Sequence, residues 1–208
     1  MRTPSSGRDA AWLVGADLLA VALAFVGQIL LAHALLAEHY GWMVLAIDLY
    51  ASLFLIIDLG LPTLIARDGT RAPELVPLAV WRSYRWQALV AVPFLLLALL
   101  ARPEQWLNVH APAVLLVLAG LVALVHVASY APRSALRVLG EARLEAITKV
   151  VERGTTVLLY GVLTWQGSSS ATAFTGAFLV GATTGWALAL FWAMRVAPPL
   201  QGAAEWNR

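Results

Sequence analysis

Six apolar stretches follow one another along the chain, and short connections separate them. About 20 apolar residues are needed to cross the hydrocarbon of a bilayer as a helix. Helices are expected because lipid cannot satisfy an open backbone, and the alternating pattern of a barrel strand is absent from the sequence. We therefore predict an all-α polytopic membrane protein, a single six-helix lobe over residues 1–208, with spans at 12–37, 41–66, 82–101, 111–131, 146–166 and 171–194.

The composition excludes several other classes of protein. Hydrophobic residues make up 61% of the chain and charged residues only 12%, whereas a soluble domain has about 45–50% apolar and about 25% charged residues. The absence of cysteine excludes disulfide scaffolds and thiol catalysis. A net charge of +2 gives no indication of nucleic-acid binding, and the histidine spacing fits no zinc motif. We expect neither a cofactor nor a metal.

The basic residues predict the direction of the spans. If both termini are cytoplasmic, 13 of the 14 Lys and Arg residues fall on the cytoplasmic side, and only Arg102 falls on the other. Such an excess is the usual mark of the cytoplasmic face. We expect a multi-pass protein of the cell membrane.

Three carboxylates lie inside predicted spans, where a charge is costly and is therefore a candidate for function. They are Asp17, Asp48 and Asp58. Asp17 and Asp58 are expected at similar depth, where they can share a cavity, while Asp48 is nearer the outer face. The functional interpretation is a proton, cation or substrate path. The alternative is a carboxylate bonded to a neighbouring helix or to a cytoplasmic arginine.

Two further charges, Glu152 and Arg153, lie at the edge of the fifth span, where we expect them to line a vestibule. The segment before them is amphipathic and is predicted to form a helix that enters this span from the cytoplasm. His126, in the fourth span, is expected to be a hydrogen-bonded interior histidine and not a ligand.

A helix break is predicted in the second span. Gly60 and Pro62 follow Asp58 closely, and proline removes a backbone donor and clashes with the preceding turn. Broken helices beside a carboxylate are frequent in transporters. A passive kink is the alternative.

Small residues recur every four positions in the sixth span, at Ala177, Gly181 and Gly185. Such a stripe allows close helix packing, against this chain or another. Motifs of enzymes are missing: the sequence has no H-E-x-x-H, no G-x-S-x-G and no P-loop. We therefore expect a protein that is not an enzyme.

Four short motifs carry a resemblance to a known family. An acidic-x-Tyr-Gly element stands at Glu38–Gly41, and Asp-Leu-Gly-Leu stands at Asp58–Leu61, followed by the basic residue Arg67. An Arg-containing amphipathic stretch covers Arg133–Glu145. With these motifs the chain resembles the amino-terminal half of polysaccharide flippases of the multidrug/oligosaccharidyl-lipid/polysaccharide exporter superfamily.

The resemblance implies translocation of a lipid-linked oligosaccharide by alternating access between two helical lobes. Asp58 would belong to the inner part of the first lobe, and Arg153 would face the cavity. Members of the family usually have 12 or 14 spans, so six imply a fragment or a half-transporter. The implied partners are the bilayer, a polyprenyl-linked glycan and a second lobe from a companion or a second copy. Two alternatives remain: a non-transporting scaffold of a glycan-assembly complex, and a small cation-coupled multidrug-type exporter.

Overall fold

The fold is given by a computed structural model that describes residues 6–58, 60–100 and 112–199. Within these ranges all regular structure is helical. The expected charges Arg2, Arg102 and Arg208, and the expected span limits at 101 and 111, lie outside the described residues. The elements are α1 (Ser6–Ala34), α2 (Ala37–Asp58), α3 (Leu61–Gly69), the 3-10 helix η1 (Pro73–Leu75), α4 (Val76–Leu100), α6 (Ala113–Val138), α7 (Ala142–Trp165) and α8 (Ala171–Val196).

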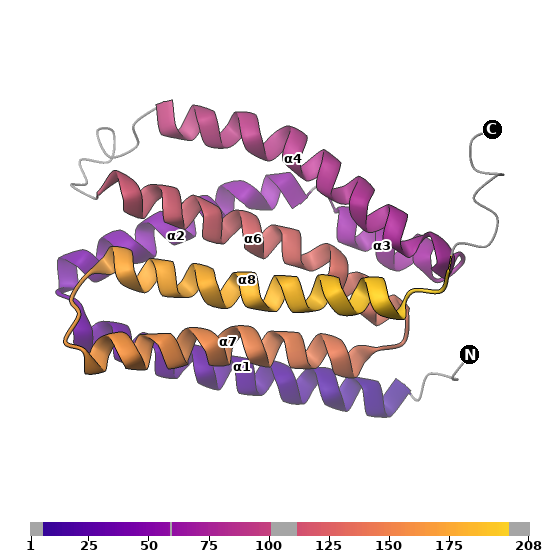
Figure 1. The fold of residues 1–208 in the computed structure, drawn as a ribbon, viewed down its shortest axis with the longest axis horizontal. Helices are drawn as coiled ribbons and strands as arrows, with labels where there is room; N and C mark the ends of the chain where they lie inside the picture. Colours follow the sequence, from indigo (N-terminus) through magenta and orange to yellow (C-terminus); the bar gives the residue numbers. More distant parts are fainter. Residues whose placement is uncertain (1–5, 59, 101–111, 200–208) are drawn as a thin grey trace.

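The long helices lie side by side and form an elongated bundle (Figure 1). α6 and α7 each pack against α8, α1 covers α7, and α2, α3 and α4 pack on α6. One end of the bundle holds the start of α1, the α3–α4 and α6–α7 connections and the end of α8, so the chain runs up and down between two ends (Figure 1).

Three of the described helical stretches are long and apolar enough to cross a membrane. They are Asp9–Ala34, Ala113–Val138 and Ala171–Val196, with 26 residues each. At a rise of 1.5 Å per residue, each is about 39 Å long, against about 30 Å of hydrocarbon. The protein is therefore a helical membrane protein.

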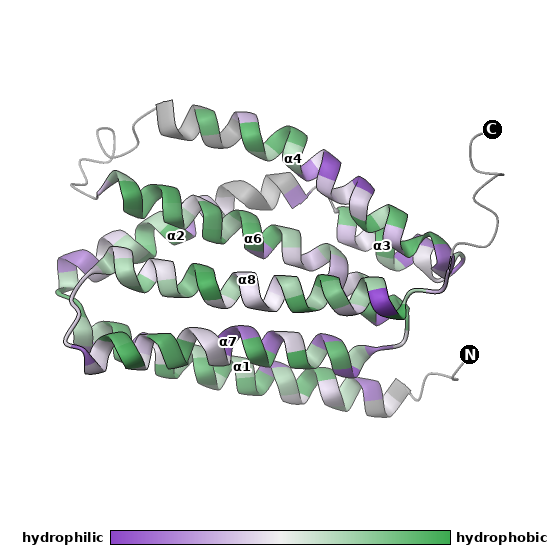
Figure 2. Cartoon of the chain, viewed as in Figure 1, coloured by the Kyte–Doolittle hydropathy of each residue, from purple (hydrophilic) through white to green (hydrophobic). Residues whose placement is uncertain are grey.

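Hydrophobic residues predominate along most of the helices (green in Figure 2), and many large apolar side chains are exposed. On α1, the side chains of Leu18, Val21 and Phe25 are each about two-thirds exposed. Soluble monomers rarely expose a continuous apolar face of this size to water, whereas such a face is favourable in contact with lipid. The exposed face of α1 is thus explained by a bilayer.

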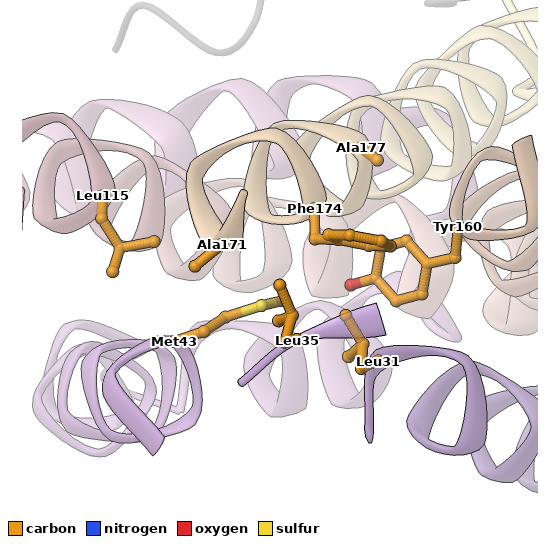
Figure 3. Packing of buried hydrophobic residues seen from close by; sticks show 8 residues of the cluster. All are labelled: Leu31, Leu35, Met43, Leu115, Tyr160, Ala171, Phe174 and Ala177. Carbon is orange, nitrogen blue, oxygen red and sulfur yellow. The ribbon is translucent and has the colours of Figure 1, made fainter. Parts of the chain in front are cut away.

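The core is built from apolar clusters between the helices. At the end opposite the α6–α7 connection, Leu31 of α1 and Met43 of α2 gather around the rings of Tyr160 and Phe174 (Figure 3). The two ring centroids are 5.3 Å apart with an interplanar angle of 69°, the edge-to-face geometry that aromatic pairs favour. This cluster joins α1, α2, α7 and α8.

The turn between α6 and α7 is short and tightly bonded. Gly140 has φ 77°, a left-handed conformation that glycine adopts without a Cβ penalty. The amide of Glu141 donates to the carbonyl of Leu136 at 2.9 Å, as in the common glycine-terminated helix end. The stretch Arg133–Glu145 is therefore the end of one helix, a tight turn and the start of the next.

Candidate functional site

Charged side chains gather where α6 and α7 meet near their connection; Glu145 and Glu152 are buried there, whereas Arg137 is more than half exposed. On α6, His126, Arg133 and Arg137 follow one another at spacings of seven and four residues. At 100° per residue, these three positions fall within about 40° of one another around the helix. On α7, Glu145, Lys149 and Glu152 share a face in the same way. The antiparallel hairpin therefore brings two complementary rows of charge together.

Glu152 is the inner centre of this arrangement. Its side chain is only 3% exposed, and both of its carboxylate oxygens are used. Arg133 donates from a guanidinium nitrogen to Oε2, and Nε2 of His126 lies 3.0 Å from Oε1. The His126 ring also packs edge-on against Phe178 of α8, with ring centroids 5.5 Å apart. An isolated buried carboxylate is costly, and these partners compensate the charge of Glu152.

Glu145, one turn from the start of α7, is completely buried and likewise paired. Arg137 holds it with two hydrogen bonds, from Nε at 3.0 Å and from a terminal nitrogen at 2.5 Å. This is the two-pronged geometry that arginine forms with a carboxylate. Lys149 approaches the same carboxylate at 3.5 Å and donates to Asp17 of α1 at 2.9 Å. The pairs thus extend from α6 through α7 to α1.

The backbone of α8 closes over Glu152 because two glycines face it. A Cβ added to Gly185 would lie 2.7 Å from Cβ and 2.8 Å from Oε2 of Glu152. A Cβ added to Gly181 would lie 2.0 Å from Oγ1 of Thr156 and 2.9 Å from the backbone oxygen of Glu152. The stripe of Ala177, Gly181 and Gly185, all buried, therefore packs against α7 of the same chain.

We call this set the interior charge cluster: Asp17, His126, Arg133, Arg137, Glu145, Lys149 and Glu152. It contains three carboxylates and three permanent cations, so the charges balance when His126 is neutral. Each carboxylate is neutralised by a cation of the chain itself. The cluster consequently ties α1, α6 and α7 together, and through the glycine contacts it also holds α8.

Arg153 lies next to Glu152 in sequence but outside the cluster. Its guanidinium carbon is 5.6 Å from the centre of the Phe178 ring, a cation–π distance. Among the described residues, Arg153 forms no ion pair. Arg153 is therefore a half-buried cation beside the cluster, held by an aromatic face.

Asp17 and Asp58, which the sequence places at similar depth, lie against different helices in the described structure. Asp17 lies against α7 and bonds to Lys149, because α1 packs on α7. Asp58 ends α2, which packs on α6. Asp48, also on α2, is exposed. The carboxylates that looked alike in the sequence thus have different surroundings.

Asp58 differs from the carboxylates of the cluster in its bonding. Its side chain is half-buried, and its buried Oδ1 has no hydrogen-bond partner in the part of the chain that the structure describes. The chain breaks immediately after it: α2 ends at Asp58 and α3 begins at Leu61. Gly60 stands between the helices with φ 67° and ψ 14°, and Pro62 lies in the first turn of α3.

The sequence does not identify five members of the cluster as candidates. It assigns Arg133, Arg137, Glu145 and Lys149 to the cytoplasmic face or to an amphipathic stretch. It assigns His126 to the interior as a hydrogen-bonded histidine. The sequence signal that could have identified them is the matched spacing of opposite charges on either side of Gly140, the residue at which the structure turns from α6 to α7. The described residues contain no group of three or more potential metal ligands.

The comparison with known families bears on this geometry. The family model of polysaccharide biosynthesis proteins matches residues 6–203. The chain belongs to this family. No match was found among curated proteins or among solved structures. Membership and the apolar helices together establish a membrane protein with a role related to polysaccharide biosynthesis, and they agree with the resemblance to polysaccharide flippases.

Proposed function

We propose that the protein is a component of a membrane transporter that translocates a lipid-linked oligosaccharide or polysaccharide precursor across the cell membrane. It acts as a half-transporter or as part of a longer transporter. Family membership supports a role with polysaccharides. The observation that supports the transport function is Asp58. Glu145 and Glu152 are neutralised within the chain, whereas the buried Oδ1 of Asp58 has no partner among the described residues.

Six spans are consistent with the helix lengths. Besides the three helices that meet the criteria for a span, α2, α4 and α7 have 22, 25 and 24 residues. These lengths correspond to about 33–38 Å, enough to cross the hydrocarbon. α7 carries five charged residues, but its buried carboxylates are paired with α6. A helix of this kind is stable in a membrane inside a bundle.

The distribution of charge supports a cytoplasmic position for the end with the α6–α7 connection. Purple residues are frequent at this end (Figure 2), which includes exposed cations of four connections or helix ends: Arg67, Arg71, Arg143 and Arg195. By the positive-inside rule, this end faces the cytoplasm. The start of α1 and the end of α8 then lie on the cytoplasmic side.

A second lobe is part of the proposal. The interface among α6, α7 and α8 is closed by the interior charge cluster and the glycine contacts, so a glycan cannot pass through it. The path must then run along this lobe and a second one, from another copy or a companion chain. Asp58 and Arg153 are the candidates to contact the ion or the diphosphate of the substrate.

The test is transport by the purified full chain in proteoliposomes, alone and together with its companion chain. The probe is a fluorescent short-chain polyprenyl diphosphate disaccharide, and loss of its accessibility to a membrane-impermeant quencher reports translocation. Asp58→Asn is expected to abolish transport with an unchanged melting temperature. Asp68→Asn, which alters an exposed carboxylate at the end of α3, is the matched control and should transport normally.

Two other outcomes would replace the proposal. Normal glycan export by Asp58→Asn in cells, with loss of assembly on substitution at Gly181 or Gly185, would indicate a scaffold. Transport of cationic drugs and not of the glycan probe would indicate a small cation-coupled exporter. Crosslinking in native membranes that shows only monomer would contradict a half-transporter.

A further inference from the structure

A groove runs along the outside of the bundle between α1 and α7. It has a volume of about 530 Å³ and almost purely apolar walls. Its lining includes Trp12, Gly15 and Leu19 of α1 and Ala146, Ile147 and Val150 of α7. This volume falls within the about 300–1,000 Å³ of small-molecule sites. The groove can therefore hold a hydrocarbon chain.

Small residues keep the groove open. A Cβ added to Gly15 would meet nothing within 4 Å, although the residue lies in the middle of a long helix. Ala16 and Ala146 are buried in the floor, where α1 and α7 approach most closely through short side chains. A larger side chain at position 15 would thus occupy the groove without displacing the two helices.

A free cation stands beside the apolar walls. Arg143, in the first turn of α7, is exposed, and its guanidinium carbon lies 5.4 Å from the centre of the Trp12 ring. Arg143 forms no ion pair with any residue that the structure describes. Lys149 and Asp17, on the same two helices, neutralise each other. Arg143 therefore supplies unbalanced positive charge next to a wall of the groove.

We propose that this groove binds one anionic phospholipid of the surrounding membrane, with an acyl chain along Gly15 and Ile147 and its phosphate on Arg143. Three observations favour this occupant: the groove opens on the lipid-facing side of α1, its walls are apolar, and the exposed cation Arg143 lies against the Trp12 ring that lines it. Arginine binds phosphate with several donors at once. The inference does not depend on the proposed transport function.

The test is lipid retention by the purified full chain in detergent, measured by native mass spectrometry. The probe is dioleoyl phosphatidylglycerol, titrated in parallel with dioleoyl phosphatidylcholine. We expect one phosphatidylglycerol molecule to be retained preferentially. Arg143→Gln should weaken its binding about fivefold, the effect of one basic residue on an anionic lipid. Gly15→Leu should weaken binding of both lipids by filling the groove.

Two matched controls distinguish binding in the groove from a general effect of positive charge or of a larger side chain. Arg195 at the end of α8 also stacks on a ring, 5.8 Å from the centre of Phe191, so Arg195→Gln removes an equivalent cation elsewhere. Gly161 of α7 is likewise open, so Gly161→Leu adds the same bulk outside the groove. Both variants should bind phosphatidylglycerol like the parent protein. If Gly15→Leu fails to fold, Ala11→Leu fills the same groove from an exposed position.

Three results would overturn the proposal. An equal loss with Arg195→Gln would mean that the charge of the whole bundle end attracts the lipid. Unchanged binding in folded Gly15→Leu and Ala11→Leu would place the chain elsewhere. Displacement of phosphatidylglycerol by a trace of short-chain polyprenyl phosphate would assign the groove to an isoprenoid carrier.

Discussion

The two sides of α6 satisfy their polar groups in different ways. On one side, α7, α8 and α1 enclose Glu145 and Glu152, and both carboxylates have cationic partners. On the other side, α2 and α4 leave Asp58 Oδ1 and both amide atoms of Gln87 buried without a partner. The first side balances its charges, although Arg133 Nε and Thr164 Oγ1 also lack a hydrogen-bond partner among the described residues. The second side leaves a carboxylate oxygen and a whole side-chain amide without one.

We infer from this difference that one side of α6 stabilises the lobe and that the other side binds an ion or substrate. Buried polar groups in native proteins are nearly always bonded, so the exceptions need an explanation. The paired charges join helices that are far apart in sequence, such as α1 and α7. An unpaired carboxylate at a helix break is free to bind an ion or a substrate. We therefore expect substitutions on the α7 side to alter stability and those at Asp58 to alter transport.

The largest expected effect is the loss of the inner carboxylate on the balanced side. Glu152→Gln leaves Arg133 buried without its counter-charge, and breaking a buried pair in this way costs about 3–5 kcal/mol. The free energy of unfolding, measured by titrating dodecyl sulfate into mixed micelles, should fall by this amount. Glu141→Gln is the control and should change little, because this half-buried carboxylate forms no ion pair with the described residues.

A double variant tests whether the unpaired charge causes this loss. Replacing both partners, with Glu152→Met and Arg133→Met, removes the charge from both sides of the contact. Most of the stability should return, because apolar residues of similar size often replace a buried pair without cost. A double variant as unstable as Glu152→Gln would contradict the argument.

A smaller loss of stability is expected when a side chain is added at Gly185, where α8 packs against Glu152. In Gly185→Ala the added methyl group would lie 2.7 Å from Cβ of Glu152, so α8 must move away from α7. Overpacking of this kind costs about 1–3 kcal/mol. Gly176→Ala on the same helix meets nothing within 4 Å and should be neutral or stabilising, since alanine favours the helix. Thermal melting of the two variants in detergent should therefore shift in opposite directions.

The other side of α6 should respond in the opposite way to loss of a polar group. Gln87→Leu removes a buried amide that has no partner, so we expect stabilisation by about 1–3 kcal/mol, the usual penalty of an unsatisfied group. Gln28→Leu provides the contrast, because Gln28 accepts a hydrogen bond from the Tyr40 hydroxyl at 2.6 Å. Chemical unfolding should show a gain for the first variant and none for the second.

The smallest effect is expected at the exposed pair of α3. Arg67 donates to Asp68 at 2.8 Å and lowers the pKa of that carboxyl below 3.8. The pair's contribution to stability is therefore present at neutral pH and is lost as the pH falls through the lowered pKa. Because both side chains are more than half exposed, Asp68→Asn should leave the melting temperature unchanged at pH 7. A clear loss of stability would show that this end packs against something else.

The sequence predicted what depends on local pattern. Apolar length predicted the helices, and glycine and proline predicted a break after Asp58, where α2 does end. The small stripe on α8 predicted close packing but did not identify its partner. That partner is α7, because Gly181 and Gly185 face Thr156 and Glu152 in the folded bundle.

What the sequence did not predict depends on contacts between distant residues. Asp17 and Lys149 are 132 positions apart, so no periodicity relates them. The positive-inside rule accounts for Arg133 and Arg137 as cytoplasmic residues, so the sequence alone gives no reason to expect their ion pairs with Glu152 and Glu145. Comparing the charge rows on the two sides of the Gly140 turn would have indicated their carboxylate partners, because the turn makes the helices antiparallel neighbours.

The paired charges of α6 and α7 also have a consequence for biogenesis. Alone in lipid, each charge near the middle of α7 would cost about 2.5–3.5 kcal/mol on insertion scales. The compensating residues for Glu145 and Glu152 are made just before them, on α6, across a turn of a few residues. The two helices should therefore leave the translocon together as a preformed hairpin. A chain truncated after Trp165 should insert α7 efficiently, and the same chain with Arg133→Leu and Arg137→Leu should fail to do so.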